Sequence, residues 1–216
     1  MTTEQATAAD RQLQVSPAPG ELETVRAFVN TLDIEEATDD FATPEGLSRW
    51  LAGRGLAAAA RVSTADLANA VALREALRGV LREHAGHPGH PGHPGHPGPP
   101  GDAGDKPGAG SAAQSPVTAV EAIAAGLPVR LAVDDEGAIA AVAAAAGVQG
   151  ALARLLLIAA AATTNGTWTR LKACTAGDCQ WAFYDRSPTR NGRWCTMSIC
   201  GSRAKSRAYR RRVQQS

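Results

Sequence analysis

The chain has 216 residues and a formal net charge of +1, from 22 Lys and Arg against 21 Asp and Glu. This length suits one medium domain and one small domain. The apolar stretch at 151–162 is too short to span a membrane and contains Arg154, so we expect a buried helix there. The N-terminus lacks the basic and apolar regions of a secretory signal, which predicts a cytoplasmic protein without membrane association.

The first predicted elements are a disordered N-terminus and a short helix. Residues 1–20 are polar and contain two prolines, so we predict no fixed structure for them. The first ordered element is expected to begin at Phe28–Leu32. Thr43 and Pro44 place a capping hydroxyl and a first-turn proline before an apolar face, which predicts a helix that ends at Gly53.

The middle of the chain combines helices with a hairpin. Helical spacing of the apolar residues predicts a helix over 63–83, a short helix over 117–125 and a third helix over 149–163. Two apolar stretches, at 129–133 and 138–143, flank an acidic turn that contains glycine, and together they predict a β-hairpin.

Residues 85–116 interrupt this body with a different composition. They contain four His-Pro-Gly repeats followed by a stretch rich in Gly, Ala and Pro, which cannot form a core. We therefore predict a low-complexity loop with partial polyproline II character. Successive histidines in such an extended chain lie about 9 Å apart, which favours a linker over a metal store.

All four cysteines lie within the last 43 residues, as two Cys-x4-Cys pairs that are separated by fifteen residues. Two short cysteine pairs joined by a loop are typical of a structural zinc site, and four thiolates leave no open position for catalysis. A pair of disulfides is the alternative. The predicted ligands of Zn²⁺ are Cys174, Cys179, Cys195 and Cys200.

Charge divides the chain into an acidic body and a basic C-terminal segment. Residues 167–216 hold eleven Lys and Arg against two acids, a charge of +9, and the rest of the chain carries −8. This asymmetry is typical of an appended nucleic-acid-binding module. A helix from Cys200 to about Arg212 would place Arg203 beside the cysteines, where it and Arg193 would balance the thiolate charge. The residues predicted to contact nucleic acid are Lys205, Arg207, Arg210, Arg211 and Arg212.

The aromatic residues of this segment predict a small core around the cysteines. We expect 180–185 to form a hairpin with a strand at Arg193 and Trp194. Two-residue alternation then places Trp181 and Phe183 on one buried face. Tyr184 is the aromatic residue expected to be exposed for contact.

The C-terminal segment resembles the CGNR-type zinc finger. The resemblance rests on the two cysteine pairs, on Arg193-Trp194-Cys195-Thr196-Met197 and on Cys200-Gly201-Ser202-Arg203, where Ser202 replaces the asparagine of the family's motif. The preceding part is similar to the ABATE domain, a domain of stress-induced transcription regulators. The matching motifs are Phe28-Val29-Asn30-Thr31-Leu32-Asp33, Pro44-x-x-Leu47-x-x-Trp50-Leu51 and Leu73-Arg74-Glu75-Ala76-Leu77-Arg78.

The resemblance implies an α+β protein, with a body of mixed helices and strands at 21–166 and a zinc finger with a basic C-terminal helix at 167–216. It implies a bacterial transcription regulator that binds DNA through the finger, with a body that senses a signal or forms a homodimer. A protein-interaction adaptor without DNA binding, or an RNA-binding protein, is the alternative. The sequence has no phosphate loop, nucleophile elbow or HExxH motif, so we expect no enzyme. The acids at 33–40 match no calcium loop and are expected on a solvated surface.

Overall fold

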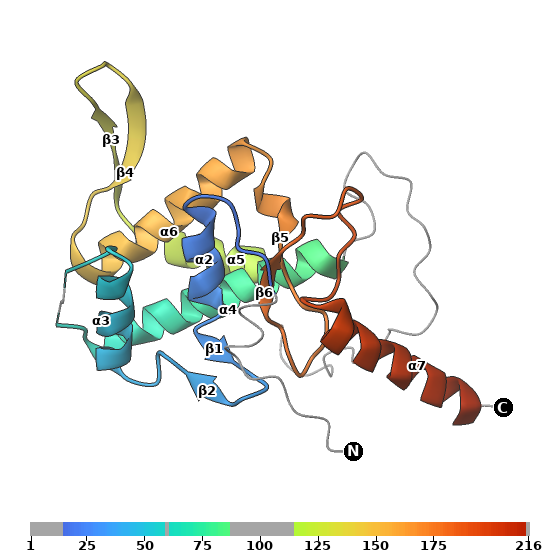
Figure 1. Cartoon of the computed structure of the whole chain (residues 1–216). Coiled ribbons are helices and arrows are strands. Elements are labelled where there is room, and N and C mark those ends of the chain that lie inside the picture. The colour runs from blue at the N-terminus through green and yellow to red at the C-terminus, as the bar shows by residue number, and fades with distance from the viewer. Residues whose placement is uncertain (1–14, 59–60, 87–114, 215–216) are drawn as a thin grey trace.

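The computed structural model describes residues 15–58, 61–86 and 115–214, so most of the predicted loop at 85–116 lies outside the described residues. The described elements confirm an α+β protein that contains helices and three separate two-stranded antiparallel sheets. In chain order they are α2 (Leu22–Val29), β1 (Leu32–Asp33), β2 (Thr38–Asp39), α3 (Pro44–Gly53), α4 (Thr64–Gly86), α5 (Pro116–Ala124), β3 (Val129–Val133), β4 (Ile139–Ala143), α6 (Gly147–Thr164), a 3-10 turn (Trp168–Arg170), β5 (Leu171–Ala173), β6 (Ala182–Tyr184), a π-helical turn (Met197–Gly201) and α7 (Ser202–Gln214) (Figure 1).

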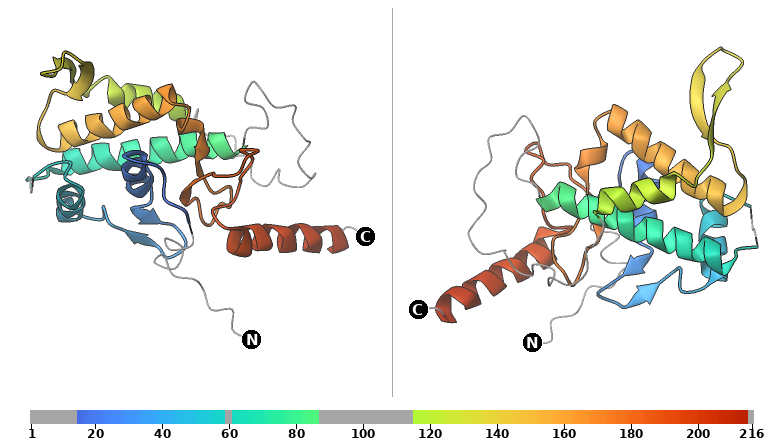
Figure 2. Two further views of the ribbon diagram at one scale, coloured as in Figure 1. Left: turned by 45° about the horizontal axis from the view of Figure 1, so that its top comes forward. Right: turned by 180° about the vertical axis from the view of Figure 1, so that it is seen from behind.

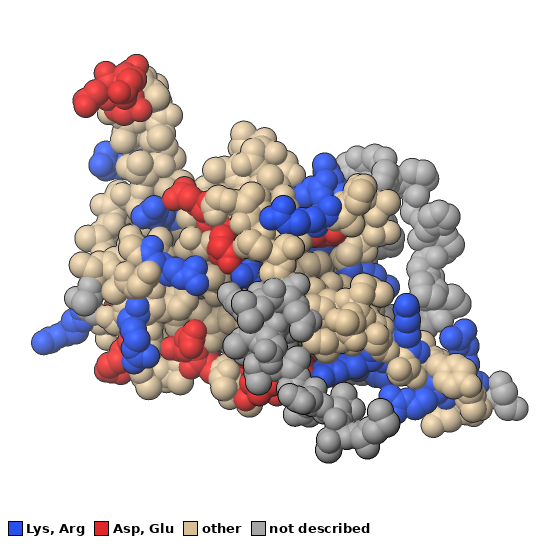
Figure 3. Space-filling model, viewed as in Figure 1, with Lys and Arg blue, Asp and Glu red and all other residues tan. Residues whose placement is uncertain are grey.

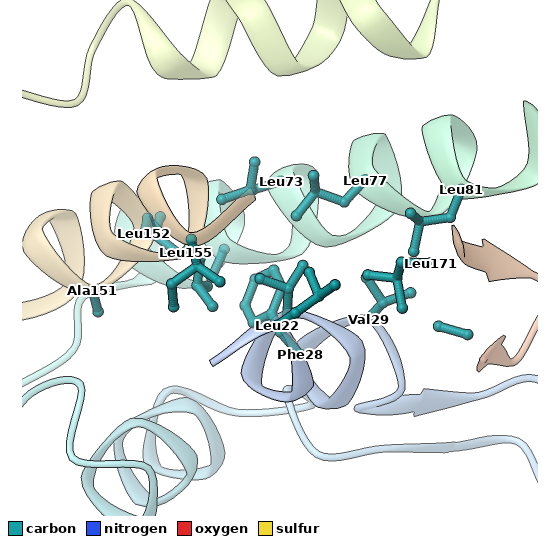
Figure 4. Close-up of a cluster of buried hydrophobic side chains, with 14 of the residues drawn as sticks. Leu22, Phe28, Val29, Leu73, Leu77, Leu81, Ala151, Leu152, Leu155 and Leu171 are labelled. Carbon is teal, nitrogen blue, oxygen red and sulfur yellow. The ribbon is translucent and has the colours of Figure 1, made fainter. Parts of the chain in front are cut away.

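The core lies where the two long helices α4 and α6 meet α2. Figure 4 shows leucines of α4 and α6 facing Leu22, Phe28 and Val29 of α2, and Leu171 of β5 joining them at one end. The core therefore continues from the body into the first strand of the cysteine-rich segment. Helix α5 packs along α4, while α7 projects away from the rest of the molecule (Figure 2).

Local signals in the sequence begin two of these helices. The hydroxyl of Thr43 accepts a hydrogen bond from Gly46 N at 3.2 Å, and Pro44 opens α3, as predicted. Ser63 and Asp66 form a reciprocal capping box before α4, with Asp66 N donating to Ser63 Oγ at 3.1 Å and Ser63 N to Asp66 Oδ2 at 3.0 Å. These caps satisfy amide groups that the helix itself leaves without partners.

The N-terminal part is more ordered than the sequence predicts. Residues 1–14 lie outside the described residues, but Val15 and Ala18 are buried, so the prediction of disorder is wrong for 15–20. Val15 packs among the cysteines and Ala18 in the main core. The first helix begins at Leu22 rather than at Phe28, because Leu22, Val25 and Phe28 already follow helical spacing into the core.

The predicted solvated surface at 33–40 holds for Glu36 and Asp40, which are exposed, but not for Asp33, Glu35 and Asp39. Asp33 is 3% exposed, and Asp39 receives two bonds from the buried Arg74, at 2.6 and 2.9 Å. Burial raises the pKa of Asp39, but the Arg74 hydrogen bond and that from Phe41 N outweigh it and lower the pKa below its ordinary value. The prediction is wrong for Asp33 and Asp39 because both carboxylates have partners within the fold. Asp33 accepts hydrogen bonds from the amides of Glu35 and Glu36, and Asp39 pairs with the buried Arg74.

Helix α6 packs in the core. This confirms the buried helix that was predicted because the apolar stretch at 151–162 is short and contains Arg154. Among the described residues it is the one helix that is long and apolar enough to cross a membrane by length and composition, and 50% of that window is buried within the protein. Its exposed face carries Arg154, which pairs with Glu21 at 3.1 Å. This combination is that of a helix packed in a protein interior.

Candidate metal centre and basic helix

The first cysteine pair lies in the loop of the β5–β6 hairpin. Leu171 pairs with Tyr184 and Ala173 with Ala182, so the chain between the strands carries Cys174 and Cys179. The predicted pairing of 180–185 with a strand at Arg193 is therefore wrong. Instead, the Arg193 carbonyl accepts Thr175 N at 3.0 Å and Thr175 Oγ1 at 3.2 Å, which brings the second cysteine segment against the first.

One face of strand β6 packs against the cysteines, and the opposite face packs against the body. Trp181 and Phe183 are 3% and 5% exposed and pack with the four cysteines, which confirms the predicted alternation. Ala182 belongs to the main core, and Tyr184 packs against that core beneath the guanidinium of Arg186. Tyr184 is thus half-buried, and its expected role as an exposed contact is wrong because the strand turns it toward the body.

The four predicted ligands converge on one point. Cys174, Cys179, Cys195 and Cys200 are buried, and their sulfur atoms all lie within 4.8 Å of one another. The Cys179–Cys195 and Cys195–Cys200 sulfur distances are 3.7 and 3.6 Å. Tetrahedral Zn–S bonds of about 2.3 Å place the sulfur atoms about 3.8 Å apart, so these thiols fit a tetrahedral metal ion.

All four cysteines are free thiols, which removes the disulfide alternative in this structure. Because the four thiols lie close together, their pKa values shift in opposite directions. Hydrogen bonds from the other three thiols lower the pKa of Cys174. Hydrogen bonds that involve Cys174 and Cys179 raise the pKa of Cys195 and Cys200, and the charge of Cys174 adds to this increase. Four thiolates need a cation among them to coexist, and this donor set suits a soft metal ion.

Two polar residues of the body, Asn30 and Arg78, form hydrogen bonds with the backbone of the cysteine-rich segment. Asn30 and Ala182 exchange two hydrogen bonds, at 2.7 and 2.9 Å, so the Asn30 amide pairs with β6 as a neighbouring strand would. Arg78 donates to the Gln180 carbonyl at 3.1 Å and to Val29 O at 2.7 Å. Gln180 directly follows the ligand Cys179 and has a positive φ of 52°. These bonds fix the backbone beside a metal ligand.

A buried ion pair orders the loop between the cysteine pairs. Lys172 donates to Asp185 Oδ2 at 2.8 Å and to the Arg190 carbonyl at 2.6 Å, and both charged side chains are nearly inaccessible. Burial raises the pKa of Asp185, but hydrogen bonds from Lys172, Ser187 and Gly192 outweigh it and lower the pKa to about 2. A Cβ at Gly192 would lie 2.9 Å from the Asp185 carboxylate, so this close approach requires glycine.

Cys200 lies in the π-helical turn that leads directly into α7. Ser202, which replaces the family's asparagine, donates its hydroxyl hydrogen bond to Met197 O at 3.1 Å. A Cβ at Gly201 would lie 2.8 Å from the sulfur of the exposed Met197, so a larger residue there would displace the end of that side chain. The orientation of α7 is therefore set by the metal centre that precedes it.

Two arginines of α7 hold the helix against acidic side chains. Arg203 donates to Glu35 of the β1–β2 turn at 2.8 Å, and Arg207 lies 3.6 Å from Asp178. The Glu35 hydrogen bond raises the pKa of Arg203, burial opposes it, and the charges of Glu35 and Cys200 add to the increase. The principal partner of Arg203 is therefore Glu35 of the body. Arg193, the other residue expected to balance the thiolates, lies over the ring of Trp194.

The remaining cations of α7 lie on its solvent side. The helix carries six Lys and Arg and no acid, and Figure 3 shows basic side chains gathered over it. The residues at the exposed positions are Lys205, Arg210, Arg211 and Arg212. Tyr209 lies among them and is 64% exposed. The sequence analysis did not predict it as a contact residue, although its position four residues after Lys205 places it on the same face of the helix. Exposed aromatic residues among cations are typical of nucleic-acid surfaces.

The comparisons with known families agree with this geometry. Residues 22–168 match the ABATE family, described as "Putative stress-induced transcription regulator", and residues 170–213 match the CGNR zinc finger. The chain belongs to the ABATE family. It carries a CGNR zinc finger directly after the ABATE domain, and the cysteine cluster forms the metal-binding part of that finger. No curated protein matched this ABATE protein in sequence.

Proposed function

We propose that this ABATE protein is a cytoplasmic bacterial transcription regulator that binds DNA through α7 and performs no catalysis. Zn²⁺ is the ion proposed for the four-cysteine site, because the four buried sulfur atoms fit its ligand type and its tetrahedral geometry. The ion would neutralise the thiolates and fix the turn from which α7 begins. No chemistry at the metal is needed for this role.

The observation that carries the proposal is the position of the α7 cations. Arg203 and Arg207 are engaged with Glu35 and Asp178, so they fix the helix. Lys205, Arg210 and the neighbouring arginines at 211 and 212 occupy exposed positions on a helix without acids. A basic helix without acids suits the phosphate backbone of a duplex, and Tyr209 is exposed for a sugar or base contact.

The experiment is a titration of a fluorescent random duplex with the zinc-loaded full chain at several salt concentrations. With about four to six phosphates neutralised, log K should fall against log [salt] with a slope of about −4 to −5. Changing Lys205, Arg210 and Arg212 together to Ala should reduce the magnitude of this slope by about 2 to 3, because each lost phosphate contact removes about 0.9. Bound zinc should stay, since these side chains are exposed.

The matched control changes the exposed body residues Arg49, Arg61 and Arg82 to Ala, which removes the same charge away from α7. We expect the control to keep the slope of the original protein. An equal loss in both variants would show that net charge, and not α7, drives binding. Absence of duplex binding at low salt would reject the regulator in favour of the protein-interaction adaptor, and clearly tighter binding to RNA would favour an RNA-binding protein.

A further inference from the structure

The β3–β4 hairpin presents an apolar face that the described parts of the molecule do not cover. Val129, Leu131 and Val133 alternate along β3, and the register pairs them with Ala143, Ala141 and Ile139 of β4. Residues paired across strands share a face, so these six side chains form one surface without a charge, which we call the hairpin face. Its four large residues are 52% to 73% exposed.

A two-stranded hairpin is marginal in water without a partner against its apolar side. The hairpin projects from the body, and only its base approaches α6 (Figures 1 and 2). The remaining sequence offers little to cover it. Residues 87–114 contain no Val, Ile, Leu, Met or aromatic residue, and residues 1–14 contain only Met1 and Leu13 as large apolar residues. These two segments thus offer no comparable apolar surface, which favours a cover that comes from another molecule.

The charges around the hairpin face fit a second copy of this chain. The tip carries Asp134, Asp135 and Glu136, visible as the acidic end in Figure 3. The base carries Arg130, exposed, and the first turn of α6, whose cap residue Ala146 supplies no side-chain hydrogen bond. Arg130 pairs with Val142 and belongs to the other face of the hairpin, so the positive charge at the base beside the hairpin face comes from the helix dipole of α6. Each five-residue strand is about 17 Å long, so two hairpins stacked in opposite directions would place each acidic tip at the partner's basic base.

We propose that the hairpin face is the interface of a homodimer in which two β3–β4 hairpins pack face to face in antiparallel orientation about a twofold axis. An apolar face without charge is self-complementary, as an isologous interface requires. Four large side chains supply less than the ~800 Å² per partner of a standard interface, so the dimer should form at micromolar concentrations. The hairpin lies on the opposite side of the molecule from α7, so both basic helices would stay accessible (Figure 2).

The test is sedimentation velocity of the zinc-loaded full chain over micromolar concentrations. The mass should rise with concentration from 22.3 kDa toward twice that value. Leu131→Glu, a change at the centre of the hairpin face, should keep the chain monomeric over the same range. Ala140→Glu adds the same charge on the other face of the hairpin, because Ala140 pairs with Ala132, and it should leave the dimer intact. Far-UV circular dichroism should show all three proteins folded, since both changed residues are exposed.

A third variant tests the antiparallel orientation. Replacing Asp135 and Glu136 by Asn and Gln removes acidic charge from the tip but leaves Asp134, which closes the turn by accepting Ala138 N at 2.8 Å. In the proposed dimer this change weakens association, because tip and base attract. Stronger or unchanged association would overturn the antiparallel arrangement. A monomer at all concentrations, or a dimer that survives Leu131→Glu, would overturn the homodimer.

Discussion

Arg78→Met should loosen the metal centre from a position within the body. Arg78 is 2% exposed, and its guanidinium donates to the carbonyls of Gln180 and Val29. A buried carbonyl that loses its donor costs about 1–3 kcal/mol, so the two together predict a loss of about 2–6 kcal/mol in the free energy of unfolding. Because Gln180 follows the ligand Cys179, we also expect metal affinity to fall about 10- to 100-fold, as for outer partners of metal ligands.

The assay combines urea unfolding with the rate of zinc release to a chromogenic chelator, both on folded protein. Arg74→Met is the matched control, since Arg74 is equally buried on the same helix but donates to Thr31, Asp39 and Glu75 of the body. Its loss should cost about 3–5 kcal/mol of stability, with zinc release close to that of the original protein. If Arg78→Met releases zinc no faster than Arg74→Met, the body does not hold the metal centre and the reasoning is refuted.

Three further changes probe the same account. Cys200→Ser should abolish tight metal binding and remove hydrogen-exchange protection from the cysteine segments and α7, while α2, α4 and α6 stay protected because Leu171, Ala173 and Ala182 remain in the main core; protection lost throughout would contradict this. The Asp185 carboxylate, with its pKa lowered to about 2, stabilises the fold above about pH 4, and this stability should disappear as the pH falls toward 2. Asp185→Asn should show a weaker dependence over that pH window, and an identical acid transition in both proteins would argue against the Lys172–Asp185 pair as its cause. Deletion of His87–Gly110 should change the melting temperature little, because closure entropy varies slowly with loop length; a large drop would show that this segment packs against the body.

Local signals in the sequence predicted those elements that local chemistry determines. The cap at Thr43 and Pro44 placed the start of α3 correctly, and the alternation of Trp181 and Phe183 identified the face that covers the cysteines. The cysteine spacing predicted which four side chains meet. In each case neighbours within a few residues carry enough information, because capping, strand alternation and ligand spacing act over short range.

The features that the sequence did not predict depend on contacts between distant segments. Strand β5 has three residues and no readable periodicity, and it forms because β6 pairs with it while Leu171 and Ala173 enter the main core. The pairing of Asp39 depends on Arg74, 35 residues away, and the position of Arg203 follows from Glu35, 168 residues away. Sequence spacing cannot show such pairs, since they exist only once the helices have packed.

The central claim is that a metal-stabilised α7 binds DNA, and one measurement tests it most directly. Metal content and duplex binding should be determined on the same full-chain preparation before chelation, after chelation and after zinc is returned. The account predicts one Zn²⁺ per chain, loss of duplex binding when the metal is removed, and recovery of binding when zinc is restored, because the turn at Cys200 sets the direction of α7. Duplex binding that is unchanged in the metal-free protein, or a fully loaded protein that binds no duplex at low salt, would contradict it.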